Sequence, residues 1–448
     1  MNDINEMKNK YSGKSLLFLD GSKLGVLAIE KAKSWGIRTI VANRYPKKSD
    51  AGKLVCDFPV DIDFSDLDAM EALIKAEKID GVMAGWTDSH LTKYAAICER
   101  AGLPAYGTKE QFELFTQKSL YKKLLEKYDI PVVEGYELTE CFDSETIKNI
   151  RFPVLVKPSD GSGSRGIKVC NNIDELKEGY EFAKNFSETG DVIVERYLTG
   201  NEVVAFWYIQ NGEANLTAVG NWHKKQYYDG VNAMGIGYTF PSDYISIYER
   251  DSVPKVKKML ADVGIKNGAM FFQFFMDDGI PKVYDIGFRL TGTLESKIVD
   301  AINGFDPMEK MIEFALSGNM GEDITDKIDP HFGNEYGWNV SFLIKPGKIA
   351  KIEGIEMIKS LPEVIDAVPN HYIGDVIEEN QKGNLTQIVL RVLGHSNSLG
   401  QINKDMNKVY NCLIVESETG EEMLLPFEDI QKYYSLIEKK DFSKIERK

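Results

Sequence analysis

Short apolar runs alternate with segments of helical spacing through the first hundred residues of the chain. The runs with the length and composition of buried strands are 15–20, 37–43 and 79–85. The segments in which apolar residues recur with a helical period are 21–36, 66–78 and 90–102. Repeated strand–helix units predict a parallel sheet with helices on both of its faces, and therefore an α/β fold.

The pattern continues with changes in the later parts of the chain. It predicts a helix at 119–128, a mixed region from about 130 to 200, a larger α/β region to about 325, and strands again in the last 120 residues. The segment 221–244 is rich in Gly, Asn and Tyr and has weak periodicity, so we expect a loop there. The chain has 448 residues, too many for a single core, and we expect two to four domains.

Charge and cysteine content narrow the class of protein. The net charge is −15, whereas a protein that neutralises phosphate backbones needs a basic surface, so we expect no nucleic-acid partner. The first fifteen residues lack the apolar region of a signal peptide, and we find no run of 18 apolar residues, so we expect no membrane span. Five widely separated cysteines argue against a disulfide framework and against a cysteine-based zinc site. These features are typical of a cytoplasmic protein.

A glycine-rich segment, KPSDGSGSRGIKV at 157–169, contains the spacing G-x-G-x-x-G. In a dinucleotide-binding fold this spacing follows a strand and begins a helix. Here a strand-like run, 152–158, precedes it, but the alternating residues of GIKV predict a second strand after it, so the segment is a hairpin flap. A protein kinase also has such a flap, but it needs a lysine on the following strand and an H-R-D loop, and no histidine here begins an H-x-D triplet.

The order of three motifs resembles the ATP-grasp superfamily, in particular its carboxylate–amine ligases. These motifs are VLVKP followed by a Gly/Ser loop and GIKV, then VIVERYLTGNEV at 192–203, then two β-like runs around Asp277-Asp278-Gly279. The resemblance implies a Rossmann-like domain at 1–105 and an ATP-grasp module at 106–330, whose flap-bearing small lobe spans about 130–200. It further implies an α+β region at 331–448, which is similar to the C-terminal region of biotin carboxylases and L-amino-acid ligases.

The resemblance also implies which residues bind ATP. Lys118 and Lys157 would contact phosphates, Glu195 and the hinge after it would hold adenine, and Glu202 would accept from the ribose hydroxyls. Lysines suit phosphate binding because they are compact, mobile point charges. The implied nucleotide-binding residues are Lys118, Lys157, Ser162, Gly163, Ser164, Gly166, Glu195, Arg196, Tyr197, Leu198 and Glu202.

In the resembling family the hairpin around Asp277-Asp278-Gly279 carries the Mg²⁺ ligands. With a three-residue loop in which Gly279 is left-handed, residue 273 pairs with residue 283, and Gln273, Asp285 and Gly287 share one face. A two-residue Asp-Gly turn would instead place Gln273 and Asp285 on opposite faces. The family usually has two acidic ligands and an asparagine, so Gln273 and Gly287 are departures that put a second metal ion in doubt.

The function implied by the resemblance is an ATP-dependent ligase. It would activate a carboxylate as an acylphosphate and join it to an amine, with an amino acid as the expected substrate and with ADP and phosphate as products. Lys157 and Arg289 would be the catalytic residues, and Mg²⁺ would be held by Gln273 and Asp285. The alternatives are ATP-grasp carboxylase or carbamoyl-phosphate chemistry, and a non-catalytic nucleotide-binding protein. A homodimer is common in the family.

Overall fold

The computed structural model describes residues 2–138, 142, 147–159, 166–228, 233–333 and 335–427. Its contacts divide the chain into two compact units. The first comprises 1–219, 244–296 and 304–330, and the second comprises 220–243, 297–303 and 331–448. The three consecutive domains expected from the sequence remain a prediction, because this division follows contacts and not continuous ranges.

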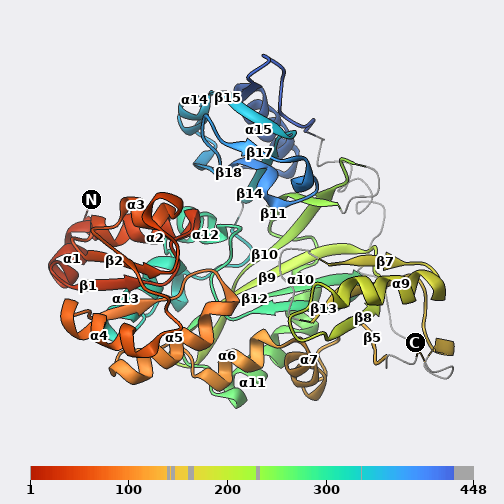
Figure 1. The fold of residues 1–448 in the computed structure, drawn as a ribbon, viewed down its shortest axis with the longest axis horizontal. Coiled ribbons are helices and arrows are strands. Elements are labelled where there is room, and N and C mark those ends of the chain that lie inside the picture. The colour runs from red at the N-terminus through yellow and green to blue at the C-terminus, as the bar shows by residue number, and fades with distance from the viewer. Residues whose placement is uncertain are drawn as a thin grey trace. The chain divides into compact units, whose positions relative to one another are not determined.

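The first unit begins with a four-stranded parallel sheet of order β3-β2-β1-β4, which confirms the predicted α/β fold (Figure 1). Its strands are β1 (Ser15–Phe18), β2 (Arg38–Asn43), β3 (Phe58–Asp61) and β4 (Gly81–Met83). The helices that alternate with these strands are α1 (Asn2–Tyr11), α2 (Lys23–Ser34), α3 (Ala51–Val55), α4 (Leu67–Glu77) and α5 (Asp88–Ala101). Strands β1 and β4 are fully buried, as continuous apolar runs in parallel sheets are.

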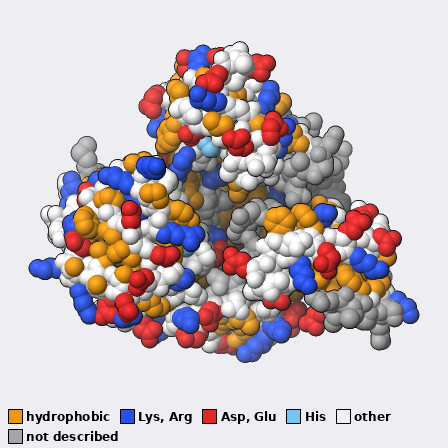
Figure 2. Space-filling model, in the orientation of Figure 1, with side chains coloured by type: hydrophobic (Ala, Val, Ile, Leu, Met, Phe, Trp, Pro, Cys, Tyr) orange, Lys and Arg blue, Asp and Glu red, His pale blue; other side chains and the backbone are white. Residues whose placement is uncertain are grey.

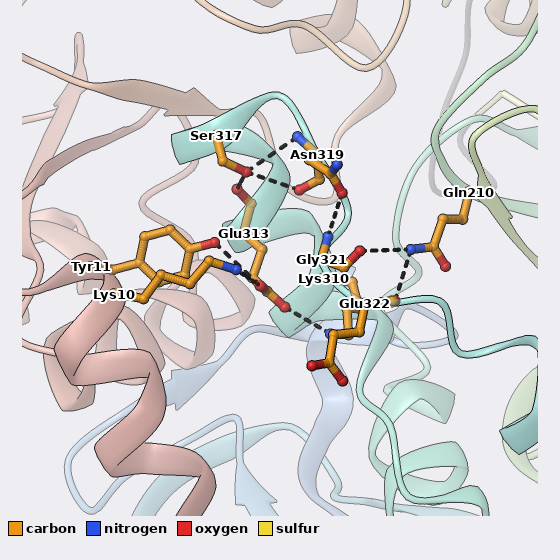
Figure 3. Close-up of polar contacts among 9 residues, drawn as sticks. All are labelled: Lys10, Tyr11, Gln210, Lys310, Glu313, Ser317, Asn319, Gly321 and Glu322. Carbon is orange, nitrogen blue, oxygen red and sulfur yellow. Dashed lines mark hydrogen bonds and ion pairs between the residues drawn. The ribbon is translucent and has the colours of Figure 1, made fainter.

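A helix from much later in the chain, α13 (Pro307–Ser317), packs against this sheet. A Cβ atom at Gly81 would lie only 2.0 Å from the carbonyl oxygen of Ala315, so only glycine allows β4 to approach α13 this closely. The buried carboxylate of Glu313 on α13 accepts hydrogen bonds from Lys10 and Tyr11 of α1, at 3.1 and 3.2 Å (Figure 3). These contacts attach the N-terminal helix to the sheet domain.

The second part of the first unit contains a small antiparallel sheet of order β5-β8-β6-β7. Its strands are β5 (Gly135–Tyr136), β6 (Val154–Pro158), β7 (Lys168–Cys170) and β8 (Val192–Arg196). Helix α9 (Ile173–Lys184) covers it, and Leu176 and Ala183 of this helix form a core with Val154, Val156 and Val194 of the sheet. Asn172 caps α9 through its side chain, which accepts from the N–H groups of Asp174 and Glu175.

A larger antiparallel sheet completes the first unit, in the order β13-β12-β9-β10. Its strands are β9 (Asn201–Gln210), β10 (Glu213–Lys225), β12 (Gly268–Asp277) and β13 (Ile280–Gly287). The remaining helices of this part of the chain are α6 (Lys109–Thr116), α7 (Lys118–Lys127), α10 (Ile245–Asp251), α11 (Val253–Val263) and α12 (Glu295–Asn303), with a short 3-10 turn, η2 (Thr325–Lys327). The unit boundary falls within β10 and within α12.

The second unit has its own core around Trp338, Phe342, Leu390, Ile402 and Val409. Its strands are the end of β10, β11 (Met234–Phe240), β14 (Tyr336–Leu343), β15 (Gly347–Glu353), β16 (Val364–Pro369), β17 (Val376–Ile377), β18 (Ile388–Ser396) and β19 (Ile414–Ser417). Its other elements are α14 (Ile355–Lys359), α15 (Leu399–Cys412), η3 (Glu379–Gln381) and η4 (Leu385–Gln387).

The expectation of a loop at 221–244 is wrong for 221–225 and 234–240, which are strands, and residues 229–232 lie outside the described part of the chain. Residues up to Lys225 continue β10, and β11 pairs with it in an antiparallel ladder that is interrupted by a bulge after His223. The side chains of His223 and Thr239 are buried and hydrogen-bonded at 2.8 Å, and burial lowers the pKa of His223 to about 3. Sequence periodicity was weak here because both faces of these strands are largely buried.

Two further observations concern the charges on the surface and the character of the helices. On the face shown in Figure 2, Lys and Arg side chains are interspersed with Asp and Glu side chains. None of the helices within the described residues combines the length and apolar character that a membrane span requires.

Candidate functional site

The strands that flank the glycine-rich segment form the predicted hairpin. β6 and β7 are antiparallel, with Val154 opposite Cys170 and Val156 opposite Lys168. No helix begins after the glycines, so the dinucleotide-binding interpretation is excluded. Ser162, Gly163 and Ser164 lie outside the described residues, and Gly166, at the start of the returning strand, has a φ of +73°.

Lys157 and Glu195 lie next to each other on paired strands β6 and β8. Their side chains are 8% and 2% exposed, and Lys157 Nζ lies 2.5 Å from Glu195 Oε2. Lys122 of α7 contacts the other carboxylate oxygen, Oε1. Burial alone would raise the pKa of Glu195, but the two ammonium groups outweigh it and hold this pKa below its ordinary value. The result is a buried ion triad in which one carboxylate is shared by two lysines.

Lys118 lies one helical turn before Lys122 and begins α7, as predicted. Within the described part of the chain its ammonium makes no hydrogen bond or ion pair. Burial lowers the pKa of Lys118, and the charge of Lys157 lowers it further, while the charges of Asp285 and Glu195 act in the opposite direction. Lys118 is therefore a desolvated cation near two carboxylates and a second lysine, and no described residue forms an ion pair with it.

The segment after Glu195 forms a hinge between β8 and β9. The N–H groups of Arg196 and Tyr197 donate to the carbonyl oxygens of Glu134 and Pro153, both at 2.9 Å. Leu198 is buried, and its N–H has no acceptor among the described residues. The Arg196 guanidinium lies 3.5 Å from Asp277. The hinge therefore presents the Leu198 N–H, which has no acceptor among the described residues, beside a buried apolar side chain.

Glu202 lies on β9, and its carboxylate is largely buried. The hydroxyl of Tyr284, on β13, donates to Glu202 Oε1. The ring of Tyr284 also packs against Phe275 of β12, with ring centroids 4.9 Å apart. Glu202 is thereby connected across the sheet to the β12–β13 hairpin.

The predicted register of the β12–β13 hairpin is wrong, although its consequence is right. The turn has two residues, Asp278 and Gly279, with φ values of 50° and 75°, and Asp277 pairs with Ile280. Continued without interruption, this register would place Gln273 and Asp285 on opposite faces. A bulge shifts the pairing after Phe274, so that Gln273 lies directly opposite Asp285.

Gln273, Asp285 and Gly287 therefore share one face, as expected. The hydroxyl of Tyr121 donates to Asp285 Oδ1 at 3.3 Å. Burial raises the pKa of Asp285, against the lowering effect of Lys118 and Lys157. Phe271 is opposite Gly287, and a Cβ atom at Gly287 would lie 2.2 Å from its ring. The aromatic ring thus occupies the space that a side chain at position 287 would need.

The oxygen donors on this face fit Mg²⁺ in part. A carboxylate and an amide oxygen are hard ligands of the kind Mg²⁺ takes, together with water and phosphate. The described residues contain no group of three or more His, Cys, Asp or Glu side chains that could hold a metal ion. A metal ion here would depend on oxygens supplied by a bound nucleotide.

Arg289 follows β13 and is held by a residue that the sequence did not indicate. Its guanidinium forms a two-point ion pair with Asp88, with Nε–Oδ1 and Nη2–Oδ2 distances of 2.8 Å each. Its central carbon also lies 5.0 Å from the Phe271 ring centroid. Asp88 begins α5 of the parallel-sheet domain, two hundred residues away in sequence, so no local pattern could have paired the two residues.

Lys122 and Tyr284 were also missed in the sequence. Lys122 had a signal, because it follows Lys118 by four residues and so lies on the same face of a predicted helix. Tyr284 had none, because its contact with Glu202 depends on the bulge. Lys118, Lys157, Glu195 and Asp285, which come from separate segments of the sequence, interact electrostatically in the structure.

Comparison with known proteins places this site in a family context. Residues 150–294 match the model of an ATP-grasp domain family. The solved structure of L-amino acid ligase from Bacillus licheniformis has a TM-score of 0.74 and 17% identity, over 91% of this chain and 99% of that one. The biotin carboxylase domain of Hydrogenobacter thermophilus 2-oxoglutarate carboxylase, solved with MgADP and bicarbonate, has a TM-score of 0.73 and 17% identity, over 92% and 91% of the two chains. At these identities the structural likeness concerns the fold.

A curated sequence relative is the carbamoyl phosphate synthase large chain of Clostridium beijerinckii. It is 26% identical over 300 residues, which are 66% of this chain and 27% of that protein. The chain spans about a quarter of the length of the first curated relatives that it matches.

Proposed function

We propose that the chain is an ATP-dependent ligase of the ATP-grasp type that joins a carboxylate to an amine, with an amino acid as one substrate. The observation that carries this proposal is the cluster formed by Lys118, Lys157, Glu195 and Asp285. It combines a desolvated cation without an ion-pair partner among the described residues, a second lysine on β6, and a carboxylate on the hairpin. Such a cluster suits a triphosphate, because its cations lack sufficient anionic partners of their own.

Each part of the nucleotide has proposed ligands. Lys118 and Lys157 bind the phosphates. Glu195 accepts from the amino group of adenine, and the free N–H of Leu198 donates to a ring nitrogen. Glu202 accepts from the ribose hydroxyls. Asp285 and Gln273, together with the phosphates, would hold Mg²⁺, which would neutralise charge on the transferring phosphoryl group.

The chemistry then needs no protein nucleophile. A substrate carboxylate oxygen attacks the γ-phosphorus and the bond to the β,γ-bridging oxygen breaks, which gives an acylphosphate and ADP. The amine nitrogen attacks the acyl carbon, loses a proton, and phosphate leaves. Arg289 stabilises the negative charge of the carboxylate and of the tetrahedral intermediate, and Asp88 holds its guanidinium in place through two hydrogen bonds.

Two other functions each have an observation in their favour. The match to carbamoyl phosphate synthase chains favours a chemistry that phosphorylates bicarbonate. The Phe271 ring beside Gly287 favours a nucleotide-binding protein without turnover, because it removes one oxygen ligand from the hairpin.

One experiment separates the three functions. The protein is incubated with Mg·ATP and pools of amino acids, in buffer with and without bicarbonate, and ADP and phosphate are measured. The ligase proposal predicts ADP release that depends on particular amino acids and is unaffected by removal of bicarbonate. ADP release that requires bicarbonate would instead support carboxylation or carbamoyl phosphate synthesis. Mg·ATP binding without release under all conditions would support the non-catalytic function.

A further inference from the structure

The two lysines that contact Glu195 come from different elements and have different environments. Lys157 lies on β6, directly before the flap segment, whereas Lys122 lies on α7. The Lys122 side chain is 15% exposed, and its ammonium also lies 3.4 Å from the carbonyl oxygen of Val133. Lys122 is therefore held between Glu195 and the backbone that precedes β5.

Nucleotide binding would change the ion pairs within this triad. If Lys157 turns to a phosphate, Glu195 loses one counter-ion although its carboxylate remains 2% exposed. A buried carboxylate without a partner is strongly disfavoured, and it takes up a proton instead. Lys118 does not contact Glu195 and is needed at the phosphates. Lys122 is the cation that can remain on Glu195 while both other lysines bind phosphate.

We propose that Lys122 is a positioning residue that keeps Glu195 ionised and oriented toward the base, and that it thereby sets the preference for a 6-aminopurine over a 6-oxopurine nucleotide. The inference rests on the proposed nucleotide site. An ionised carboxylate only accepts hydrogen bonds, so it accepts from the amino group of adenine and repels the 6-oxo group of hypoxanthine. A protonated carboxyl can donate to that oxo group, and the discrimination is then lost.

The other titratable groups near Glu195 do not replace Lys122. Within the described residues, Lys157 faces it from β6, and Lys118 and Tyr121 interact with it from α7 at longer range. Burial raises the pKa of Tyr121 well above its ordinary value, so it stays neutral near pH 7. Loss of Lys122 therefore removes the lasting counter-charge and raises the pKa of Glu195.

The test compares ATP with inosine triphosphate, which carries a 6-oxo group. Affinities of both magnesium complexes are measured by calorimetry between pH 6 and pH 8 for wild type, Lys122→Met, Lys122→Gln and Lys122→Arg. Lys123→Met is the matched control, because Lys123 is an exposed neighbour on the same helix. The ratio of the two affinities is the readout, because protonation of the triphosphate affects both nucleotides alike.

For wild type, Lys122→Arg and Lys123→Met, we expect a preference for ATP that does not change with pH. Lys122→Met should bind ATP roughly tenfold more weakly, as expected when a charged hydrogen-bond partner is lost. Its preference for ATP should also decrease as pH falls, because Glu195 becomes protonated. Lys122→Gln should show the same pH dependence, since an amide supplies a hydrogen bond but no charge.

Two results would overturn the inference while leaving the proposed function intact. One is a wild-type ATP preference in Lys122→Met and Lys122→Gln at every pH. The other is an equal loss of affinity for both nucleotides that does not vary with pH, which would mean that Lys122 has a structural role only. Failure of the wild-type protein to bind ATP at all would instead refute the proposed function.

Discussion

Replacing Gly287 by asparagine should destabilise the protein and should not restore a metal ligand. A Cβ atom at this position would lie 2.2 and 2.6 Å from two ring carbons of Phe271, which is 5% exposed. Carbon atoms in contact are normally about 3.5–4.0 Å apart, so the ring must move by more than about 1 Å. Overpacking of this kind costs roughly 1–3 kcal/mol. Displacing the ring from the Arg289 guanidinium adds roughly 0.5–1 kcal/mol.

The measurement is thermal unfolding combined with a Mg²⁺ titration of activity. For a protein of this size, each kcal/mol lowers Tm by about 2–4 °C or less, so we expect a decrease of several degrees. Phe271→Ala supplies the control, because it creates the missing space. In the Phe271→Ala background, Gly287→Asn should lower the free energy of unfolding much less than it does in wild type. This difference is a favourable coupling energy between the two positions.

The thermal stability and the Mg²⁺ requirement of Gly287→Asn can refute this reasoning. If Gly287→Asn unfolds at the wild-type temperature and lowers the Mg²⁺ concentration needed for half-maximal activity, the ring does not exclude a side chain there. The asparagine would then be a ligand that this chain merely lacks.

Further predictions test the other parts of the site. Lys157→Met should weaken ATP binding by roughly 1.5–3 kcal/mol, the value of a charged hydrogen bond, and calorimetry on the folded variant that finds unchanged affinity would remove Lys157 from the phosphate site. Glu202→Gln should weaken ATP binding more than 2′,3′-dideoxy-ATP binding, and equal losses would show that Glu202 is not the ribose ligand. Asp285→Asn should abolish turnover, whereas Gln273→Glu should lower the Mg²⁺ requirement. Because burial raises the pKa of Asp285, its ionised form costs stability above that pKa, so Asp285→Asn without nucleotide should melt above wild type at pH 7 and lose this advantage at low pH.

The parallel-sheet domain could be predicted from the sequence because its signals are local. Strands β1, β2 and β4 coincide with apolar runs, and α5 coincides with a helical period. The β6–β7 hairpin could also be predicted, because the alternating residues after the glycines indicate a strand. In these cases propensity, periodicity and tertiary packing agree.

The β12–β13 hairpin shows where local reasoning fails. The Asp-Gly pair suggested a turn, but whether that turn has two or three residues depends on the conformation of Asp278, which is left-handed here. The bulge that compensates is fixed by packing on both sides of the hairpin, since Tyr284 contacts Glu202 and Asp285 contacts Tyr121. A single extra residue in β13 therefore serves two contacts, neither of which has a sequence signature.

The residues of the candidate site could be predicted from the sequence, but the ion pairs between them could not. Motifs indicated Lys118, Lys157, Glu195 and Asp285, yet nothing in the sequence indicated that Glu195 is shared by two lysines or that Asp88 holds Arg289. Ion pairs between distant segments follow from topology, and a single sequence does not reveal them.

The charges within the cluster explain how a nucleotide site can persist on a hairpin with few metal ligands. Lys118, Lys122 and Lys157 face two carboxylates, Glu195 and Asp285, inside a protein whose net charge is −15. The cluster is thus locally positive, and burial lowers the pKa of Lys118 because the nearby charges of Asp285 and Glu195 do not outweigh the cost of desolvating its ammonium. A phosphate group would supply a further anion, so ATP affinity depends first on the lysines. The hairpin then has to hold Mg²⁺ only after the phosphates have arrived, and for this one carboxylate and one amide oxygen suffice.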